Sequence, residues 1–256
     1  INQPKEQIKI NTSVLYPYDI CRKAFNCYKD LDDPERVALN TYWENLPDYY
    51  DGKEENAIAV CDVSGSMSGS PMCAAVSLSA YVAEKGHGPF ANHFITFSGV
   101  PQLVKFNGID IVDKLQRTTS ADWGMSTNIE AVFDLLLRIA KDKNTNLDDM
   151  PERLYIFSDM EFDAAINEVR HYNDSEDKIQ TLLESIAEKW DRNGYQLPNV
   201  VFWNLDARSN NIAAIGKRFS YVSGMSPSIL KAVLTGKSGY DLMLEALLNE
   251  RYNCIF

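Results

Sequence analysis

The sequence predicts an α/β fold with a doubly wound, mostly parallel sheet flanked by helices, Rossmann-like in its layout, and an N-terminal helical extension. Short continuous apolar runs of strand length recur along the chain, as is typical of parallel strands buried on both faces. Longer segments with apolar residues at helical spacing lie between them. No run approaches the roughly 18 apolar residues needed to cross a bilayer, so we expect no membrane-spanning segment.

The first part of the chain is expected to form a helical lead-in over residues 1–50, the end of a longer helical region. Residues 18–28 carry apolar side chains at helical spacing. Asp33 followed by Pro34 indicates the cap and the first turn of a second helix, which a later Leu-Pro pair would end. The main domain is expected to occupy residues 51–256.

Within the main domain, predicted strands alternate with predicted helices. The expected strands are residues 57–63, 94–97, 103–106, 153–158, 199–204 and 219–223. The second and third of these should pair as an edge hairpin. The expected helices are residues 71–83, 109–115, 128–140, 177–192, 226–234 and 240–248. This alternation predicts a mostly parallel sheet, and in such sheets ligands bind beyond the carboxyl ends of the strands.

Composition narrows the classes of function. The net charge of -11 gives no support for nucleic-acid binding, because an acidic surface repels phosphate backbones and anionic lipid, whereas it suits cation binding. The five cysteines include no C-x-x-C pair, and Cys61 and Cys73 lie in apolar patterns, so we expect reduced thiols and a cytoplasmic location. The three histidines show no zinc-like spacing, and His87 and His93 are interpreted as structural or solvated.

Oxygen-bearing side chains gather at three of the predicted strand ends and helix starts. Residues 62–69 read Asp-Val-Ser-Gly-Ser-Met-Ser-Gly after the first strand, Thr127 stands before a helix, and Asp159 follows a later strand. Hydroxyl and carboxylate ligands without Cys or His favour Mg²⁺, Mn²⁺ or Ca²⁺ over zinc or copper. Two simpler interpretations stay open: the Asp-x-Ser-x-Ser loop as a helix-capping turn, and Asp159 as a helix cap.

This pattern resembles the metal-ion-dependent adhesion site of the von Willebrand factor A/integrin I-like superfamily. Asp62, Ser64, Ser66, Thr127 and Asp159 match its five positions in order. The resemblance implies that the two serines bind the ion directly, Thr127 directly or through water, and the two aspartates mostly through water. An open coordination position would then take a carboxylate from a partner. Met-Ser before Thr127 and Met-Glu after Asp159 depart from the usual Gly-Gly and Gly, which makes this an atypical branch.

The layout of helices followed by an A-like domain also resembles the Ro autoantigen (TROVE) group and, more closely, an uncharacterised family of cellular and viral proteins. The matching stretches are Tyr16–Ala24, Cys61–Met72, Ile156–Ala164 and Gly224–Leu248. In the Ro group a helical-repeat ring binds RNA beside the A-like domain, so RNA association of the full-length protein would belong mainly to residues that precede this chain.

The expected function is a non-enzymatic, divalent-cation-dependent interaction domain that captures an acidic group of a partner protein. A module of an RNA-associated, Ro-like particle and a metal-dependent phosphohydrolase are the alternatives. A nucleophile elbow is excluded because Met67 stands where its serine should be, and a phosphate-binding loop because no lysine closes the Gly/Ser-rich turn. We further hypothesise that Glu161 and Asp163 tune the local potential. Trp123 either rims the site or packs in the core.

Overall fold

A computed structural model describes residues 16–26, 33–50, 52–119, 128–159, 172–206 and 219–226, and single residues of the C-terminal part, Ile229, Ala232, Val233, Leu244, Leu247 and Leu248. In this part of the chain six strands form one sheet in the order β3-β2-β1-β4-β5-β6. Their bounds are β1 Ala57–Cys61, β2 His93–Thr96, β3 Leu103–Lys105, β4 Arg153–Ser158, β5 Asn199–Asn204 and β6 Phe219–Ser223.

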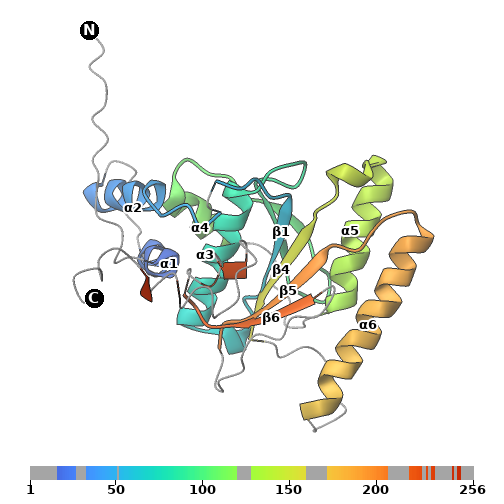
Figure 1. Ribbon diagram of the computed structural model, residues 1–256. Helices are drawn as coiled ribbons and strands as arrows, with labels where there is room; N and C mark the ends of the chain where they lie inside the picture. Colours follow the sequence, from blue (N-terminus) through green and yellow to red (C-terminus); the bar gives the residue numbers. More distant parts are fainter. Residues whose placement is uncertain are drawn as a thin grey trace.

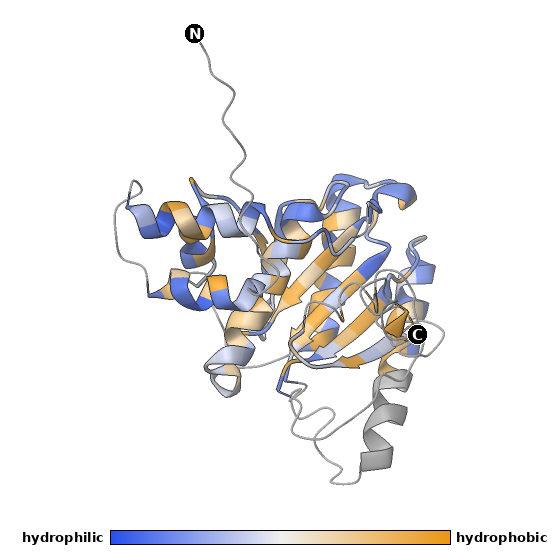
Figure 2. Cartoon of the chain, turned by 60° about the vertical axis from the view of Figure 1, so that its left-hand side comes forward, coloured by the Kyte–Doolittle hydropathy of each residue, from blue (hydrophilic) through white to orange (hydrophobic). Residues whose placement is uncertain are grey.

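The sheet is parallel except at one edge, where β2 and β3 pair antiparallel as the expected hairpin. Strands β1 and β4 lie in the middle, and every residue of β1 is buried. Figure 2 shows the strands as predominantly apolar ribbons between the helices. The predicted α/β fold with a mostly parallel sheet is therefore confirmed.

Helices cover both faces of the sheet (Figure 1). On one side α3 (Ser70–Lys85) packs against β1, with α1 (Pro17–Phe25), α2 (Pro34–Glu44) and α4 (Ile111–Thr119) around it. On the other side lie α5 (Ile129–Lys143) and α6 (Tyr172–Arg192). Because side chains alternate along a strand, β1 serves both layers: its Ala and Cys residues pack on the α3 side, and its Ile and Val residues on the α5 side.

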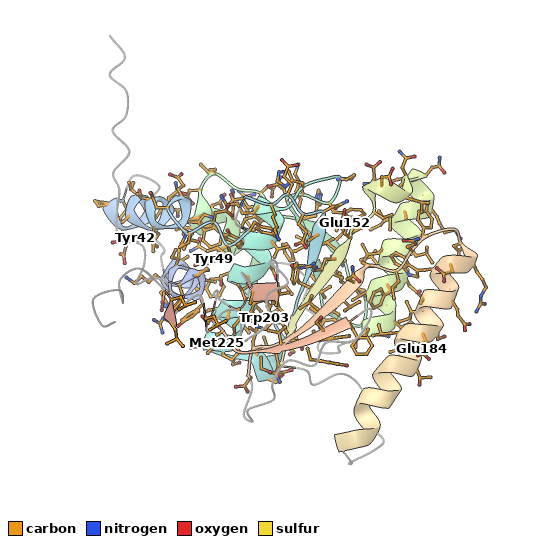
Figure 3. The ribbon with its side chains drawn as sticks, viewed as in Figure 1. Tyr42, Tyr49, Glu152, Glu184, Trp203 and Met225 are labelled. Atoms are coloured by element: carbon orange, nitrogen blue, oxygen red, sulfur yellow. The ribbon has the colours of Figure 1, made fainter. Side chains whose placement is uncertain are left out.

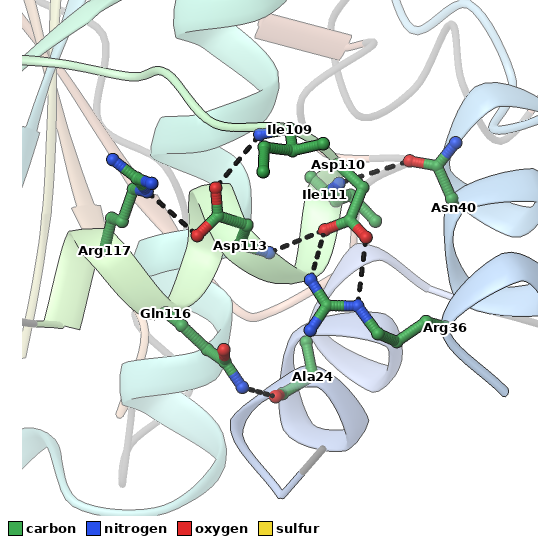
Figure 4. Close-up of polar contacts among 9 residues, drawn as sticks. All are labelled: Ala24, Arg36, Asn40, Ile109, Asp110, Ile111, Asp113, Gln116 and Arg117. Atoms are coloured by element: carbon green, nitrogen blue, oxygen red, sulfur yellow. Dashed lines mark hydrogen bonds and ion pairs between the residues drawn. The ribbon is translucent and has the colours of Figure 1, made fainter. Parts of the chain in front are cut away.

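The two N-terminal helices join the core on the α3 side. Polar contacts fasten them to α4 (Figure 4). Arg36 of α2 makes a two-pronged ion pair with Asp110, with nitrogen–oxygen distances of 3.0 and 2.9 Å. Gln116 of α4 donates to the carbonyl oxygen of Ala24 in α1 at 2.9 Å. The expected N-terminal helices are present, and the domain division at residue 50 stays a prediction.

Several element boundaries differ from the expected ones. Strand β1 ends at Cys61, two residues early. Helix α4 starts at Ile111 because the Asp110 carboxylate accepts the backbone N–H of Asp113 at 2.8 Å and so caps the helix. Helix α6 begins at Tyr172, earlier than the expected residue 177. The two expected closing helices lie mostly outside the described residues.

The large aromatic side chains behave as core residues, as expected. Trp43, Trp190 and Trp203 are buried, whereas Trp123 lies outside the described residues. Trp203, marked in Figure 3, also donates its ring N–H to the carbonyl of Gly224 just beyond β6, which holds that strand end in place. Within the described ranges, no helix is both long and apolar enough to cross a membrane.

Candidate metal centre

The candidate centre is built at the carboxyl ends of the two central strands. Strand register pairs Cys61 with Phe157, so the residues that follow, Asp62 and Ser158, are also neighbours. The backbone N–H of Asp62 continues the sheet by donating to the Phe157 carbonyl at 3.0 Å. Both Asp62 and Ser158 are fully buried. The sheet therefore places a carboxylate and a hydroxyl side by side at the position where such sheets bind ligands.

Each carboxylate oxygen of Asp62 accepts a hydrogen bond from a neutral donor. The Ser64 backbone N–H donates to Oδ1 at 2.8 Å, and the Ser158 hydroxyl donates to Oδ2 at 2.6 Å. Burial raises the pKa of the Asp62 carboxyl, hydrogen bonds from Ser158 and Ser64 oppose the rise, and the nearby Asp159 charge adds to it. Asp62 forms no ion pair with any described residue. Asp159 is thus a second acid at this end of the strands, and Asp62 has no cation from the described chain.

A tight turn after Asp62 presents two hydroxyls. The chain forms a single 3₁₀ turn over Gly65–Met67, in which the Met67 backbone N–H donates to the Ser64 carbonyl at 3.0 Å and the Met67 side chain is fully buried. This turn holds the Ser64 and Ser66 hydroxyl oxygens 3.1 Å apart. Gly69 then takes a φ of +93°, a backbone conformation that favours glycine, before α3 begins.

The donors present fit a small divalent cation. Octahedral Mg²⁺ with bonds of about 2.1 Å places neighbouring ligand oxygens about 3.0 Å apart. The 3.1 Å separation of the Ser64 and Ser66 hydroxyl oxygens matches that geometry. Within the described ranges, no group of three or more His, Cys, Asp or Glu side chains could hold a metal by itself. An ion here would therefore depend on the serine hydroxyls as well as on carboxylates.

Four of the five predicted ligands lie in the described part of the chain. Asp62, Ser64 and Ser66 are brought together by the turn, and Asp159 lies directly after β4, near enough to act on the Asp62 charge. Thr127 lies outside the described residues, as do Glu161 and Asp163, whose proposed role stays a hypothesis.

The helix-capping interpretation of the Asp-x-Ser-x-Ser loop is wrong for the described structure. The N-cap of α3 is Gly69, and no side chain caps that helix. Ser64 precedes the 3₁₀ turn and likewise makes no capping hydrogen bond with its side chain. The serine hydroxyls therefore serve no capping role at these two helix starts, and they remain available as ligands.

Ser158 is the residue that sequence reasoning missed. Its hydroxyl contacts Asp62 across 96 positions of the chain, whereas the sequence pattern marked it only as the last residue of a buried strand. A usable signal was present: a hydroxyl residue directly before a candidate ligand, at the end of a strand that could lie next to β1.

The described histidines lie away from this centre. The backbone N–H of His87 donates to the Glu55 carbonyl, near the start of β1, and His93 is the first residue of β2. Both therefore lie toward the amino ends of the strands, at the opposite end of the sheet from Asp62, which agrees with their interpretation as structural or solvated.

This sheet, with helices on both faces and helices at its N-terminal side, defines a von Willebrand factor A-like α/β fold. The fold is similar to the crystal structure of the RO (RSR) protein of Deinococcus radiodurans, with a TM-score of 0.51 and 18% identity, over 88% of this chain and 45% of that one. A weaker likeness links it to the manganese-loaded TRAP protein of Plasmodium vivax, with a TM-score of 0.40 and 10% identity over 71% of this chain and 73% of that one. That score is too low to support an inference about this chain.

The chain belongs to the family described as a domain of unknown function, DUF7788, whose sequence model matches residues 56–250. It is also 29% identical over 236 residues to the uncharacterized protein L728 of Acanthamoeba polyphaga mimivirus, a match that covers 91% of this chain. The chain spans 39% of the length of that viral protein.

Proposed function

We propose that this chain is a divalent-cation-dependent protein-interaction domain. Asp62, Ser64, Ser66, Thr127 and Asp159 hold Mg²⁺, with Mn²⁺ or Ca²⁺ as substitutes, in the manner of a metal-ion-dependent adhesion site. The ion keeps one coordination position open for a carboxylate of a partner protein. Serine hydroxyls and carboxylates are hard oxygen ligands, which suit all three of these ions.

The observation that supports this function most strongly is the buried Asp62 carboxylate beside a second acid. A carboxylate in low dielectric that receives only neutral donors, with another acid nearby, carries an electrostatic cost, and a bound cation would relieve it. Ser64 is half-buried and Ser66 exposed, so the hydroxyl side of the site faces solvent, where a partner can approach.

We propose a binding role and no catalysis. Nucleophilic catalysis by a serine needs a base within hydrogen-bond reach of the hydroxyl. The Ser64 hydroxyl has the Ser66 hydroxyl at that distance, and the two described histidines lie toward the other end of the sheet. Phosphatase activity that depends on Asp159 would instead support the phosphohydrolase alternative.

The domain is also proposed to work in the reducing cytoplasm. Cys21, Cys61 and Cys73 are free and buried in the described part of the chain, as expected for reduced thiols packed in the core.

Isothermal titration with Mg²⁺ and Mn²⁺ tests the ion site. Asp62→Ala should weaken binding about 100-fold, at the upper end of what loss of a supporting carboxylate does to metal sites. Asp134→Ala, which removes a surface aspartate of α5 paired with Lys189, is the matched control and should bind like the wild type. Equal affinity of wild type and Asp62→Ala would overturn the ion site.

The carboxylate partner is tested with a displayed library of acidic peptides, selected in Mg²⁺ and eluted with chelator. Selected peptides should lose binding when the critical Asp or Glu becomes Asn or Gln, because an amide does not replace an anionic ligand. Filter binding of RNA with a salt titration checks the competing role: tight binding with a steep salt dependence would favour an RNA-associated module over peptide capture.

A further inference from the structure

The Ser158 hydroxyl makes the shortest polar contact at the candidate centre. It donates to Asp62 Oδ2 at 2.6 Å, within the range of roughly 2.5–2.7 Å for a hydroxyl bound to an ionised carboxylate. Both residues are fully buried, so water does not compete for this bond. The contact is thus a short hydrogen bond in a low-dielectric place.

Hydrogen bonds from Ser158 and Ser64 together fix the orientation of the Asp62 carboxylate plane. The Ser64 backbone N–H binds Oδ1 and the Ser158 hydroxyl binds Oδ2, so rotation about the last side-chain bond would break one or both bonds. Ser158 is itself fixed, because it ends β4 and its partner residue in β5 is Asn204. The β4 backbone therefore sets the direction in which the remaining lone pairs of Asp62 point.

Removing the hydroxyl would leave a buried carboxylate oxygen without this donor. Such an oxygen either stays unsatisfied or turns toward another donor, and either outcome changes the geometry offered to an ion. Ser158 itself stands outside the five-residue ligand set, so its effect on the ion passes through Asp62.

We propose that Ser158 is a positioning residue of the ion site: its hydrogen bond holds the Asp62 carboxylate in the orientation that receives the divalent cation. This proposal rests on the proposed function of the site. Support of this kind around metal sites is commonly worth 10- to 100-fold in affinity, so Ser158→Ala should weaken Mn²⁺ binding by about 10-fold or more.

The test measures Mn²⁺ affinity by titration and apo-protein stability by thermal unfolding for a set of variants of the whole chain. Ser158→Thr retains the hydroxyl and should bind close to wild type. Ser158→Cys replaces it with a weak donor of similar shape and should bind more weakly. Ser77→Ala is the matched control, because Ser77 is equally buried but donates to the Ala74 carbonyl within α3.

If Ser158 had a purely structural role, Ser158→Ala would lower the stability of the protein without a selective loss of Mn²⁺ affinity. We expect Ser158→Ala to lower the unfolding temperature of the apo-protein at least as much as Ser77→Ala, because it removes a donor from a buried carboxylate, and we expect only Ser158→Ala to lose Mn²⁺ affinity. In an Asp62→Ala background, Ser158→Ala should add no further loss, since the serine acts through the aspartate.

Wild-type affinity in Ser158→Ala would overturn the positioning role and leave the ion site intact. An equal loss of affinity in Ser77→Ala would also overturn it. If Ser158→Ala does not fold, Ser158→Cys decides, and wild-type affinity there counts against the proposal. Failure of the wild type to bind Mn²⁺ is a separate result, which would overturn the proposed function itself.

Discussion

A carboxylate lies at each end of the central strands, fully buried in Asp62 and partly buried in Glu55, and the two have different partners. Near the amino ends, Glu55 receives the Arg153 guanidinium at 3.1 Å and the Tyr155 hydroxyl at 2.9 Å. Near the carboxyl ends, Asp62 receives a backbone N–H and the Ser158 hydroxyl and lies near a second acid, Asp159. The first carboxylate has its counter-ion from the same chain, and the second has only neutral donors.

This difference separates a structural ion pair from a candidate ligand site. Arg153 also donates to the carbonyl of Val233 at 3.2 Å, so the same guanidinium links Glu55 to a residue late in the chain. Glu55 thus has an opposite charge from the same chain. Asp62 has no oppositely charged partner in the described chain, and an external cation would supply that charge.

The largest effect is expected from Arg153→Met, which leaves the partly buried Glu55 without its cation. The free energy of unfolding should fall by about 3 kcal/mol, because the ion pair and the Arg153 hydrogen bonds to Tyr155 and Val233 are lost together, while Mn²⁺ affinity stays at the wild-type value. Urea unfolding and Mn²⁺ titration measure the two quantities. Arg117→Met, which breaks the more exposed pair with Asp113, is the control and should lose much less stability, because solvent screens that pair. Equal losses in the two variants would remove the contrast between the strand ends.

The next effect is the gain in stability on adding Mg²⁺. At a free concentration about 100 times its dissociation constant, Mg²⁺ should stabilise the wild type by about 2.7 kcal/mol, because it binds the folded state alone. Asp62→Asn should gain much less, yet in cation-free buffer it should be as stable as wild type or more so, since it removes one of two neighbouring charges. Thermal unfolding with and without Mg²⁺ measures both, and an equal gain in the two proteins would place the bound ion elsewhere.

The smallest effect is a pH dependence at the amino end. Burial raises the pKa of the Glu55 carboxyl above its ordinary 4.5, against the opposing effect of Arg153. A folded-state pKa above the unfolded value stabilises the protein at low pH, and that contribution is lost as the pH rises through the folded value. Wild type should thus lose stability relative to Glu55→Gln above about pH 4.5, by at most about 1.4 kcal/mol per pH unit for one proton. Unfolding curves of both proteins across pH measure it, and a relative gain would show the ion pair outweighing burial.

The local sequence pattern was sufficient to predict most strands of the sheet. The bounds of β4, β5 and β6 agree with those predicted. β4 and β5 each contain a continuous apolar run, whereas β6 mixes serines with apolar residues, as suits a strand at the edge of the sheet. Boundaries set by a side chain from outside the run were less predictable. Helix α4 begins at the residue that follows the Asp110 cap, and β1 ends where Asp62 turns its carboxylate to Ser64.

The same distinction between local and long-range information applies to the residues of the candidate site. Asp62, Ser64 and Ser66 belong to one turn, so their proximity followed from spacing alone. The approach of Asp159 and Ser158 required β4 to lie next to β1, and strand order does not follow from periodicity. The general rule that ligands bind at the carboxyl ends of parallel strands is what allowed Asp159 to be expected there.

The sequence alone therefore determined the layered α/β architecture, the buried strands and the oxygen-rich turn, because each depends on residues close together in the chain. Tertiary structure decided which carboxylate has a cation: it brought Arg153 to Glu55 and only neutral donors to Asp62. It also brought the Ser158 hydroxyl to the Asp62 carboxylate. The physical reason is that charge pairing and hydrogen bonding between strands depend on strand order and register, which local sequence patterns do not specify.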